Sequence, residues 1–148
     1  MKEFEIKGNR QVLVDLEVGE YSDSNNRITA YAQEDLHQVG YLNFKVKGRS
    51  ADIWSFKVDD PQYLRTGVGN IMLNCFEEYC RDNRVQCIEG RFYPDGEGAV
   101  YSREFYESHG YSIYRDGYEQ YLIKRLEPVE TNSPVDYTLI PNNQDLNQ

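Results

Sequence analysis

The first half of the chain alternates between apolar and polar residues with the period of two that is typical of β-strands. Four spans carry this alternation: residues 11–18, 27–33, 37–47 and 51–58. Short runs rich in Gly, Ser, Asn and Asp separate the spans and predict turns. In the last span Trp54, Phe56 and Val58 fall on one side, where we expect Trp54 to anchor the core. Two antiparallel hairpins in series are therefore predicted.

After Pro61 the pattern changes to the period of an α-helix. Between residues 68 and 81 the apolar residues recur three and four positions apart, which predicts one buried stripe. This stripe consists of Val68, Ile71, Met72, Cys75, Phe76, Tyr79 and Cys80. The side expected to face solvent carries Asn70, Asn74, Glu77, Glu78 and Arg81. Asp82-Asn83 is expected to end the helix.

The remaining elements are short. Residues 85–90 predict a strand parallel to the one that ends at Val58, because a helical crossover joins the two. Ser102 is expected to cap a short helix over 102–109, and Gly110 stands in the usual C-terminal glycine position. The last elements form a closing hairpin of residues 111–114 and 118–125. The order of elements predicts an α+β fold with a mixed, mostly antiparallel sheet.

A length of 148 residues predicts one domain, which we assign to residues 1–126. Residues 127–148 are polar and proline-containing, which favours a flexible tail, with Val135 to Ile140 as an alternative edge strand. The first residues mix charges with apolar side chains and lack the apolar core of a secretory signal. No apolar run is long enough to span a membrane. We therefore expect a cytoplasmic protein.

Composition excludes several function classes. The net charge of −9, from 16 basic and 25 acidic residues, argues against nucleic-acid binding and weakly favours a cationic partner. The three cysteines, Cys75, Cys80 and Cys87, are expected to be small hydrophobic residues in a reducing compartment. With only His37 and His109 in the chain, no zinc spacing forms, and neither a metal site nor a histidine-based triad is expected.

Gly67 and Gly69 lie where the long helix begins. Glycines let a ligand approach the backbone, and the free N–H groups and dipole of a helix start attract phosphate. A Walker A loop is disfavoured because Asn70-Ile71 stands where Lys and Ser or Thr are needed. A dinucleotide fingerprint is disfavoured because Met72 replaces its third glycine. A helix that merely starts on flexible residues remains an alternative.

The order of elements, together with two motifs, resembles the GNAT superfamily of acyl-CoA-dependent N-acyltransferases over residues 27–125. Gly67-Val68-Gly69 is similar to the second half of the family motif Arg/Gln-x-x-Gly-x-Gly/Ala. Phe105-Tyr106 followed by Gly110-Tyr111 is similar to the family's late aromatic-Tyr-x-x-x-Gly-aromatic stretch. Together, in this order and spacing, the two motifs imply a GNAT-like sheet whose N-terminal helices are reduced or absent.

The resemblance implies that two neighbouring strands splay apart and hold the pantetheine arm of acetyl-CoA, with a backbone N–H on the thioester oxyanion. The implied CoA-binding positions are Phe56, Lys57 and Val58 on the strand, and Arg65, Thr66, Gly67, Val68, Gly69 and Asn70 at the helix start. Tyr106 stands at the position of the general acid that protonates the leaving thiolate. The implied activity is transfer of an acetyl group from acetyl-CoA to a primary amine.

The chain departs from the family pattern at three places. Leu64 stands where the family has Arg or Gln, with Arg65 one step later. Ala99 replaces an Asn that often lies seven residues before the tyrosine. Residues 20–26 are too few for the helices that normally wall the acceptor site. The acceptor pocket is therefore expected to be open, or to be completed by the tail or a second subunit.

Several alternatives remain open from the sequence. The general base is Asp52, Glu89 or a water molecule, and His109 is expected to be a helix cap or a surface residue. The acceptor is a small-molecule amine or a protein amine, and the chain is a monomer or a homodimer. The alternative function is a non-catalytic GNAT-like module that recognises a protein or CoA without turnover.

Overall fold

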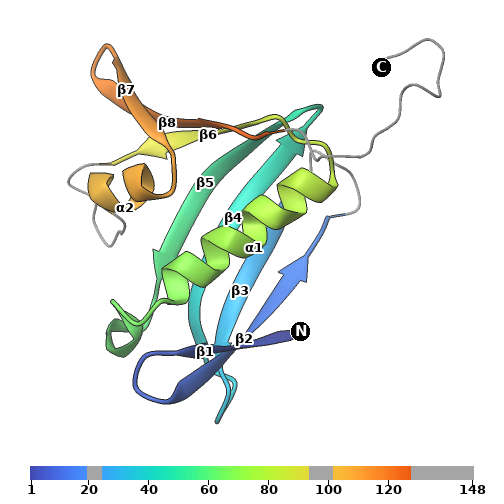
Figure 1. Cartoon of the computed structure of the whole chain (residues 1–148), viewed down its shortest axis with the longest axis vertical. Coiled ribbons are helices and arrows are strands. Elements are labelled where there is room, and N and C mark those ends of the chain that lie inside the picture. Colours follow the sequence, from blue (N-terminus) through green and yellow to red (C-terminus); the bar gives the residue numbers. More distant parts are fainter. Residues whose placement is uncertain (20–24, 94–101, 128–148) are drawn as a thin grey trace, which may run out of the picture.

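The structure, a computed structural model, describes residues 1–19, 25–93 and 102–127. Its strands are β1 (Lys2–Ile6), β2 (Arg10–Glu17), β3 (Asn26–Ala32), β4 (Gln38–Lys47), β5 (Ser50–Val58), β6 (Cys87–Phe92), β7 (Ser112–Asp116) and β8 (Glu119–Arg125). They form one eight-stranded sheet in the order β1-β2-β3-β4-β5-β6-β8-β7 (Figure 1). Among the strands of the described residues, only β5 and β6 pair in parallel. The predicted α+β fold with a mixed, mostly antiparallel sheet is confirmed.

The helix α1 (Val68–Asp82) crosses one face of the sheet over β3, β4 and β5 (Figure 1). Of the predicted stripe, Val68, Met72, Phe76 and Cys80 are buried, as the spacing predicts. Its other members, Ile71, Cys75 and Tyr79, are half-buried, and Leu73, which was not assigned to the stripe, is fully buried. The Phe76 ring meets the ring of Phe44 at a centroid distance of 4.8 Å, in an edge arrangement that suits aromatic pairs. The core therefore lies between α1 and the concave side of the central strands.

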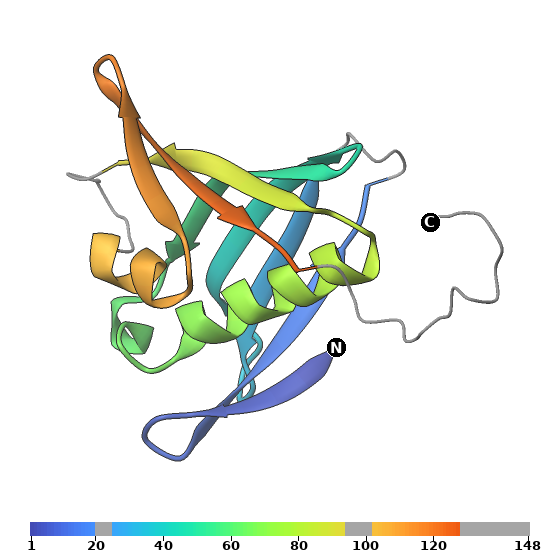
Figure 2. The same ribbon diagram turned by 45° about the horizontal axis from the view of Figure 1, so that its top comes forward.

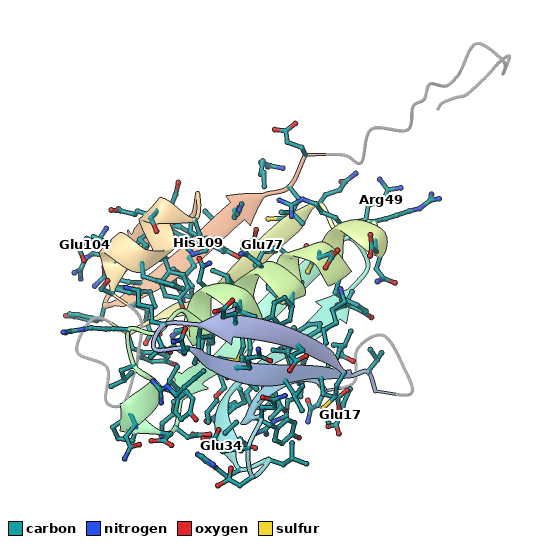
Figure 3. All side chains as sticks on the ribbon, turned by 60° about the horizontal axis from the view of Figure 1, so that its bottom comes forward. Glu17, Glu34, Arg49, Glu77, Glu104 and His109 are labelled. Atoms are coloured by element: carbon teal, nitrogen blue, oxygen red, sulfur yellow. The ribbon has the colours of Figure 1, made fainter. Side chains whose placement is uncertain are left out.

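The prediction that Glu77 faces solvent is wrong. Its carboxylate is buried between α1 and the closing hairpin, on the side of α1 toward His109 (Figure 3). Lys124 donates to Oε1 and the Tyr111 hydroxyl donates to Oε2, each at 2.8 Å. Lys124 also donates to the carbonyl oxygen of His109 at 2.6 Å. Because these partners come from distant parts of the chain, the helical pattern alone gave no sign of them.

Trp54 is not a core anchor, because the residue is 47% exposed. The pairing of β4 with β5 shifts at this point, so that Asn43 lies opposite Ser55 while Phe44 lies opposite Ile53. This β-bulge inserts one residue into β5 and interrupts the alternation of its side chains. Ile53 and Phe56 are both buried, although they lie three residues apart. Trp54 is therefore turned to the outer face of the sheet.

The strand β1, which the sequence pattern did not predict, forms a hairpin with β2 at the edge of the sheet. The turn of this hairpin contacts residues 65–70 at the start of α1, which we call the glycine loop. The N–H of Lys7 donates to the carbonyl of Thr66 in this loop at 3.1 Å. The candidate strand at 135–140 and Ala99 lie outside the described residues. Within the described ranges, no helix is long and apolar enough to cross a membrane.

Candidate active site

The strands β5 and β6 diverge after a short paired stretch. In the described residues their pairing covers only 50–53 of β5 and 87–90 of β6. The remainder of β5 stays paired with β4 as far as Val58, and the remainder of β6 stays paired with β8 as far as Phe92. Figures 1 and 2 show the two strands separating toward the end of β5 that leads into α1. The parallel pair predicted from the sequence is therefore splayed.

The hydrogen bonds between β4 and β5 beyond the bulge show which peptide groups of β5 face this divergence. The N–H of Asp59 donates to the carbonyl of Val39 at 2.7 Å, so Lys57 takes the next hydrogen-bonded position, opposite Tyr41. The peptide groups of Phe56 and Val58 consequently turn away from β4, toward the side on which β6 has diverged. Phe56, Lys57 and Val58 are the strand positions predicted to bind CoA. The peptide group of Lys57 faces β4 and not the side of the divergence.

The glycine loop opens α1 with its amides outward. Gly67 is the N-cap residue with φ of +106°, a conformation that favours glycine, and no side chain caps the helix. In the described part of the chain, none of the backbone N–H groups of residues 65–70 donates a hydrogen bond. A Cβ atom at Gly67 would meet nothing within 4 Å. The helix start therefore has N–H groups without a hydrogen-bond acceptor and the positive end of its dipole, with open space beside Gly67, while Thr66, Val68 and Gly69 are buried.

The side chains around this helix start point in different directions. Thr66 and Val68 are buried, and the Thr66 hydroxyl donates to the carbonyl of Tyr63 at 2.6 Å. Arg65 and Asn70 are exposed, as is Leu64 at 53%. Thr66 and Val68 therefore expose almost no surface, and the accessible positions of the helix start are Arg65, Gly67 and Asn70.

Tyr106 lies on the short helix α2 (Arg103–Ser108), where the Ser102 hydroxyl oxygen caps the helix by accepting from the N–H of Phe105 at 3.1 Å. The Tyr106 ring lies 6.4 Å from Phe56 of β5 and 6.1 Å from Phe92 of β6, measured between centroids. It thus packs against both strands beyond the point where their pairing ends. Burial raises the pKa of the Tyr106 hydroxyl above its ordinary value of 10.0, which keeps it protonated at neutral pH.

The two candidate bases lie on the other face of the sheet. Asp52 and Glu89 are opposite each other in the parallel pair and both are exposed, whereas Ala51 and Ile53 point into the core. Burial, and then the neighbouring charge of Glu89, raises the pKa of Asp52. Neither carboxylate therefore joins the aromatic cluster around Tyr106.

An exposed histidine links the loop before α1 to the turn between β3 and β4. His37 Nδ1 lies 2.6 Å from Oδ1 of Asp35, and Nε2 lies 2.8 Å from Oδ2 of Asp60. Asp60 also caps the 3-10 turn η1 (Pro61–Tyr63), which leads into the glycine loop. Because carboxylates only accept hydrogen bonds, both ring nitrogens donate only when the imidazole is protonated. Sequence reasoning missed this arrangement, since it depends on the meeting of two loops.

We expect the two histidines to titrate on opposite sides of 6.5. The hydrogen bonds that His37 donates to Asp35 and Asp60 raise the pKa of His37, whereas burial lowers the pKa of His109. The link made by His37 is therefore complete below pH 6.5 and is lost as the pH rises through the raised pKa. NMR titration of the two imidazole C–H signals checks this order, and Asp35→Asn should lower the midpoint of His37 alone. Equal midpoints, or the reverse order, would contradict it.

No protein-family model and no curated protein matches the chain. Among solved structures, the PaiA N-acetyltransferase from Thermoplasma acidophilum, in complex with coenzyme A, aligns with a TM-score of 0.58 at 18% identity, covering 68% of this chain and 60% of that one. Ard1 from Thermoplasma volcanium aligns with a TM-score of 0.55 at 22% identity, covering 68% of this chain and 70% of that one. The GNAT domain of S. lividans PAT aligns with a TM-score of 0.68 at 10% identity, covering 84% of this chain and 96% of that one. The strand order, the splayed pair and these alignments show that the chain has the GNAT fold.

Proposed function

We propose that the chain is an acyl-CoA-dependent N-acyltransferase that moves an acetyl group from acetyl-CoA to a primary amine. The observation that carries the proposal is the divergence of β5 and β6 beside a helix start with free amides. The structure of similar fold from Thermoplasma acidophilum is a complex with coenzyme A, which supports the ligand class. The fold as a scaffold does not by itself specify a reaction, so the proposal depends on the site.

The residues at the helix start fit a diphosphate. The N–H groups of residues 65–70 supply donors, the helix dipole attracts the negative charge, and the missing side chain at Gly67 leaves room. The pantetheine arm would lie along the end of β5 at Val58, in the manner of an added strand. This places the thioester near Tyr106, which packs against Phe56.

The reaction then needs three contributions from the chain. The amine nitrogen forms a bond to the thioester carbonyl carbon, and a backbone N–H of the Phe56 to Val58 stretch stabilises the oxyanion. The carbon–sulfur bond breaks, and the Tyr106 hydroxyl donates its proton to the departing thiolate. The amine loses a proton to water, because Asp52 and Glu89 lie on the other face of the sheet, and the tyrosine regains one from solvent. The products are an N-acetylated amine and free CoA.

Gly67→Ala should weaken acetyl-CoA binding by at least about tenfold, a loss of roughly 1.4 kcal/mol. The added methyl group occupies the space assigned to the diphosphate, and φ of +106° strains a residue with a Cβ by about 1–2 kcal/mol. Gly48→Ala in the turn between β4 and β5 is the matched control, because Gly48 also has a positive φ and open space around it. Isothermal titration calorimetry compares the two variants. Equal affinity in both would remove the diphosphate from this loop.

A non-catalytic GNAT-like module remains the second candidate, because Leu64 replaces the family's Arg or Gln and only residues 18–25 connect β2 to β3. Turnover of acetyl-CoA with a panel of small amines, polyamines and peptides separates the two. Release of CoA with at least one amine supports the enzyme. Binding of acetyl-CoA with no turnover on any amine supports the module. The single domain at 1–126, the cytoplasmic location and a monomeric or dimeric state stay predictions.

A further inference from the structure

A groove runs along α1 on the side that faces β1. It has a volume of about 670 Å³, and Phe4 of β1 and Ile71 and Cys75 of α1 form its apolar wall. A second hollow of about 400 Å³ continues it toward Met1 and Tyr79. Figures 2 and 3 show the hairpin of β1 and β2 lying alongside α1. The groove is thus a half-apolar surface that the described residues leave open.

The strand beside the groove is the edge of the sheet. In the described residues β1 pairs with β2 alone, so one row of its backbone N–H and C=O groups has no strand partner. Lys2 of β1 lies 3.6 Å from Glu78 of α1, which joins the two walls of the groove. An exposed edge of this kind readily accepts an added strand.

The chain itself supplies a segment of suitable pattern. Residues 135–140 read Val-Asp-Tyr-Thr-Leu-Ile and are bounded by Pro134 and Pro141. Val135, Tyr137 and Leu139 share one face of a strand, and β-branched and aromatic residues favour that conformation. In an otherwise polar tail, this is the stretch able to bury apolar surface.

The tail also begins in the right place. The N–H of Leu126 donates to the carbonyl of Gln86 at 2.9 Å, so the described chain ends near the C-terminal end of α1. Asp82, the last residue of α1, lines the groove there. At about 3.3 Å per residue, residues 127–134 reach up to about 26 Å, while the whole of α1 is roughly 22 Å long. The segment can therefore reach any part of the groove.

We propose that residues 135–140 of this chain occupy the groove between β1 and α1 and add a strand to the edge of β1. Entering from the C-terminal end of α1, the segment covers Cys75 and Ile71 with its apolar face. It also restrains the hairpin whose turn bonds to Thr66 of the glycine loop. The acyltransferase proposal does not depend on this docking, and the docking does not depend on it.

The natural cysteines test the proposal in the full-length chain. Cys75 lines the groove, Cys87 is also half-buried but lies on β6, and Cys80 is fully buried. Alkylation by iodoacetamide, followed residue by residue with mass spectrometry, is compared between the natural chain and the double variant Tyr137→Asp/Leu139→Asp. We expect Cys75 to react at least about tenfold faster in the variant, with Cys87 unchanged. Protection of Cys80 in both shows that the variant remains folded.

Asn142→Asp/Asn143→Asp is the matched control, because it adds the same charge to the tail beyond the segment. It should leave the rate at Cys75 as in the natural chain. Equal rates at Cys75 in the natural chain and the Tyr137→Asp/Leu139→Asp variant would overturn the proposal. Protection of Cys75 that falls on dilution would overturn it too, by assigning the groove to the tail of a second copy.

Discussion

Tyr106→Phe is expected to lower the turnover of acetyl-CoA by at least about 100-fold, since a positioned general acid contributes roughly 10²–10⁴-fold. The hydroxyl is removed while the ring keeps its contacts with Phe56 and Phe92, which place it beside the diverging strands. The affinity for acetyl-CoA should stay within a factor of about two, because the amides of the glycine loop are unchanged. Steady-state release of CoA and calorimetric titration measure the two quantities.

The exposed Tyr114 offers a matched control, since Tyr114→Phe removes a hydroxyl from β7 and should leave turnover unchanged. A second readout distinguishes an acid from a packing residue. With an activated thioester whose thiol leaves without a proton, Tyr106→Phe should recover most of its rate. Full activity of Tyr106→Phe with acetyl-CoA itself would show that the leaving thiolate takes its proton elsewhere.

Lys124→Met is expected to destabilise the fold by about 3 kcal/mol or more. The side chain is only 17% exposed and its ammonium group donates to both Glu77 and the His109 carbonyl. Without it, the buried carboxylate keeps, among the residues that the structure describes, only the Tyr111 hydroxyl and the more distant Arg81. The end of α2 also loses the donor that holds it against β8. Urea unfolding followed by circular dichroism measures the change.

The ion pair of Arg91 and Glu119 provides the comparison, because both side chains are exposed and water screens their attraction. Arg91→Met removes one positive charge there, as Lys124→Met does at the buried site. Its cost should stay below about 1 kcal/mol. The double variant Glu77→Gln/Lys124→Met should be less destabilised than the sum of its single changes, since the two groups act as a pair. A loss below 1 kcal/mol in Lys124→Met would mean that the buried pair does not hold the closing hairpin in place.

Local signals in the sequence were sufficient for most of the fold. The three-and-four spacing after Val68 predicted α1, and the alternation in residues 37–58 predicted β4 and β5. Ser102 caps α2, and Gly110 follows it with a positive φ, as their residue types predict. These features depend on neighbours within a few positions, which is why a linear pattern reveals them.

The features that sequence reasoning missed depend on distant contacts. Glu77 is buried because of Tyr111 and Lys124, and β1 becomes a strand only because β2 pairs with it. The bulge turns Trp54 outward although its spacing matches that of Phe56. Burial and pairing between remote segments override local pattern at such places.

The candidate site divides in the same way. The residues of the glycine loop and Tyr106 could be named from two short motifs, because each motif encodes a local backbone or helix position. The splay of β5 from β6 and the inward packing of Tyr106 follow from tertiary structure. The assignment of these residues to CoA binding and proton transfer stays a prediction.

The most direct test of the site is the change in backbone amide NMR shifts when acetyl-CoA is added to the labelled full-length chain. We expect large shifts at residues 65–70, which present free N–H groups, and at Val58, whose peptide group faces the diverging strand. The amides of the β4–β5 turn around Gly48 should not move. No shifts at millimolar acetyl-CoA, or shifts confined to other surfaces, would contradict the account.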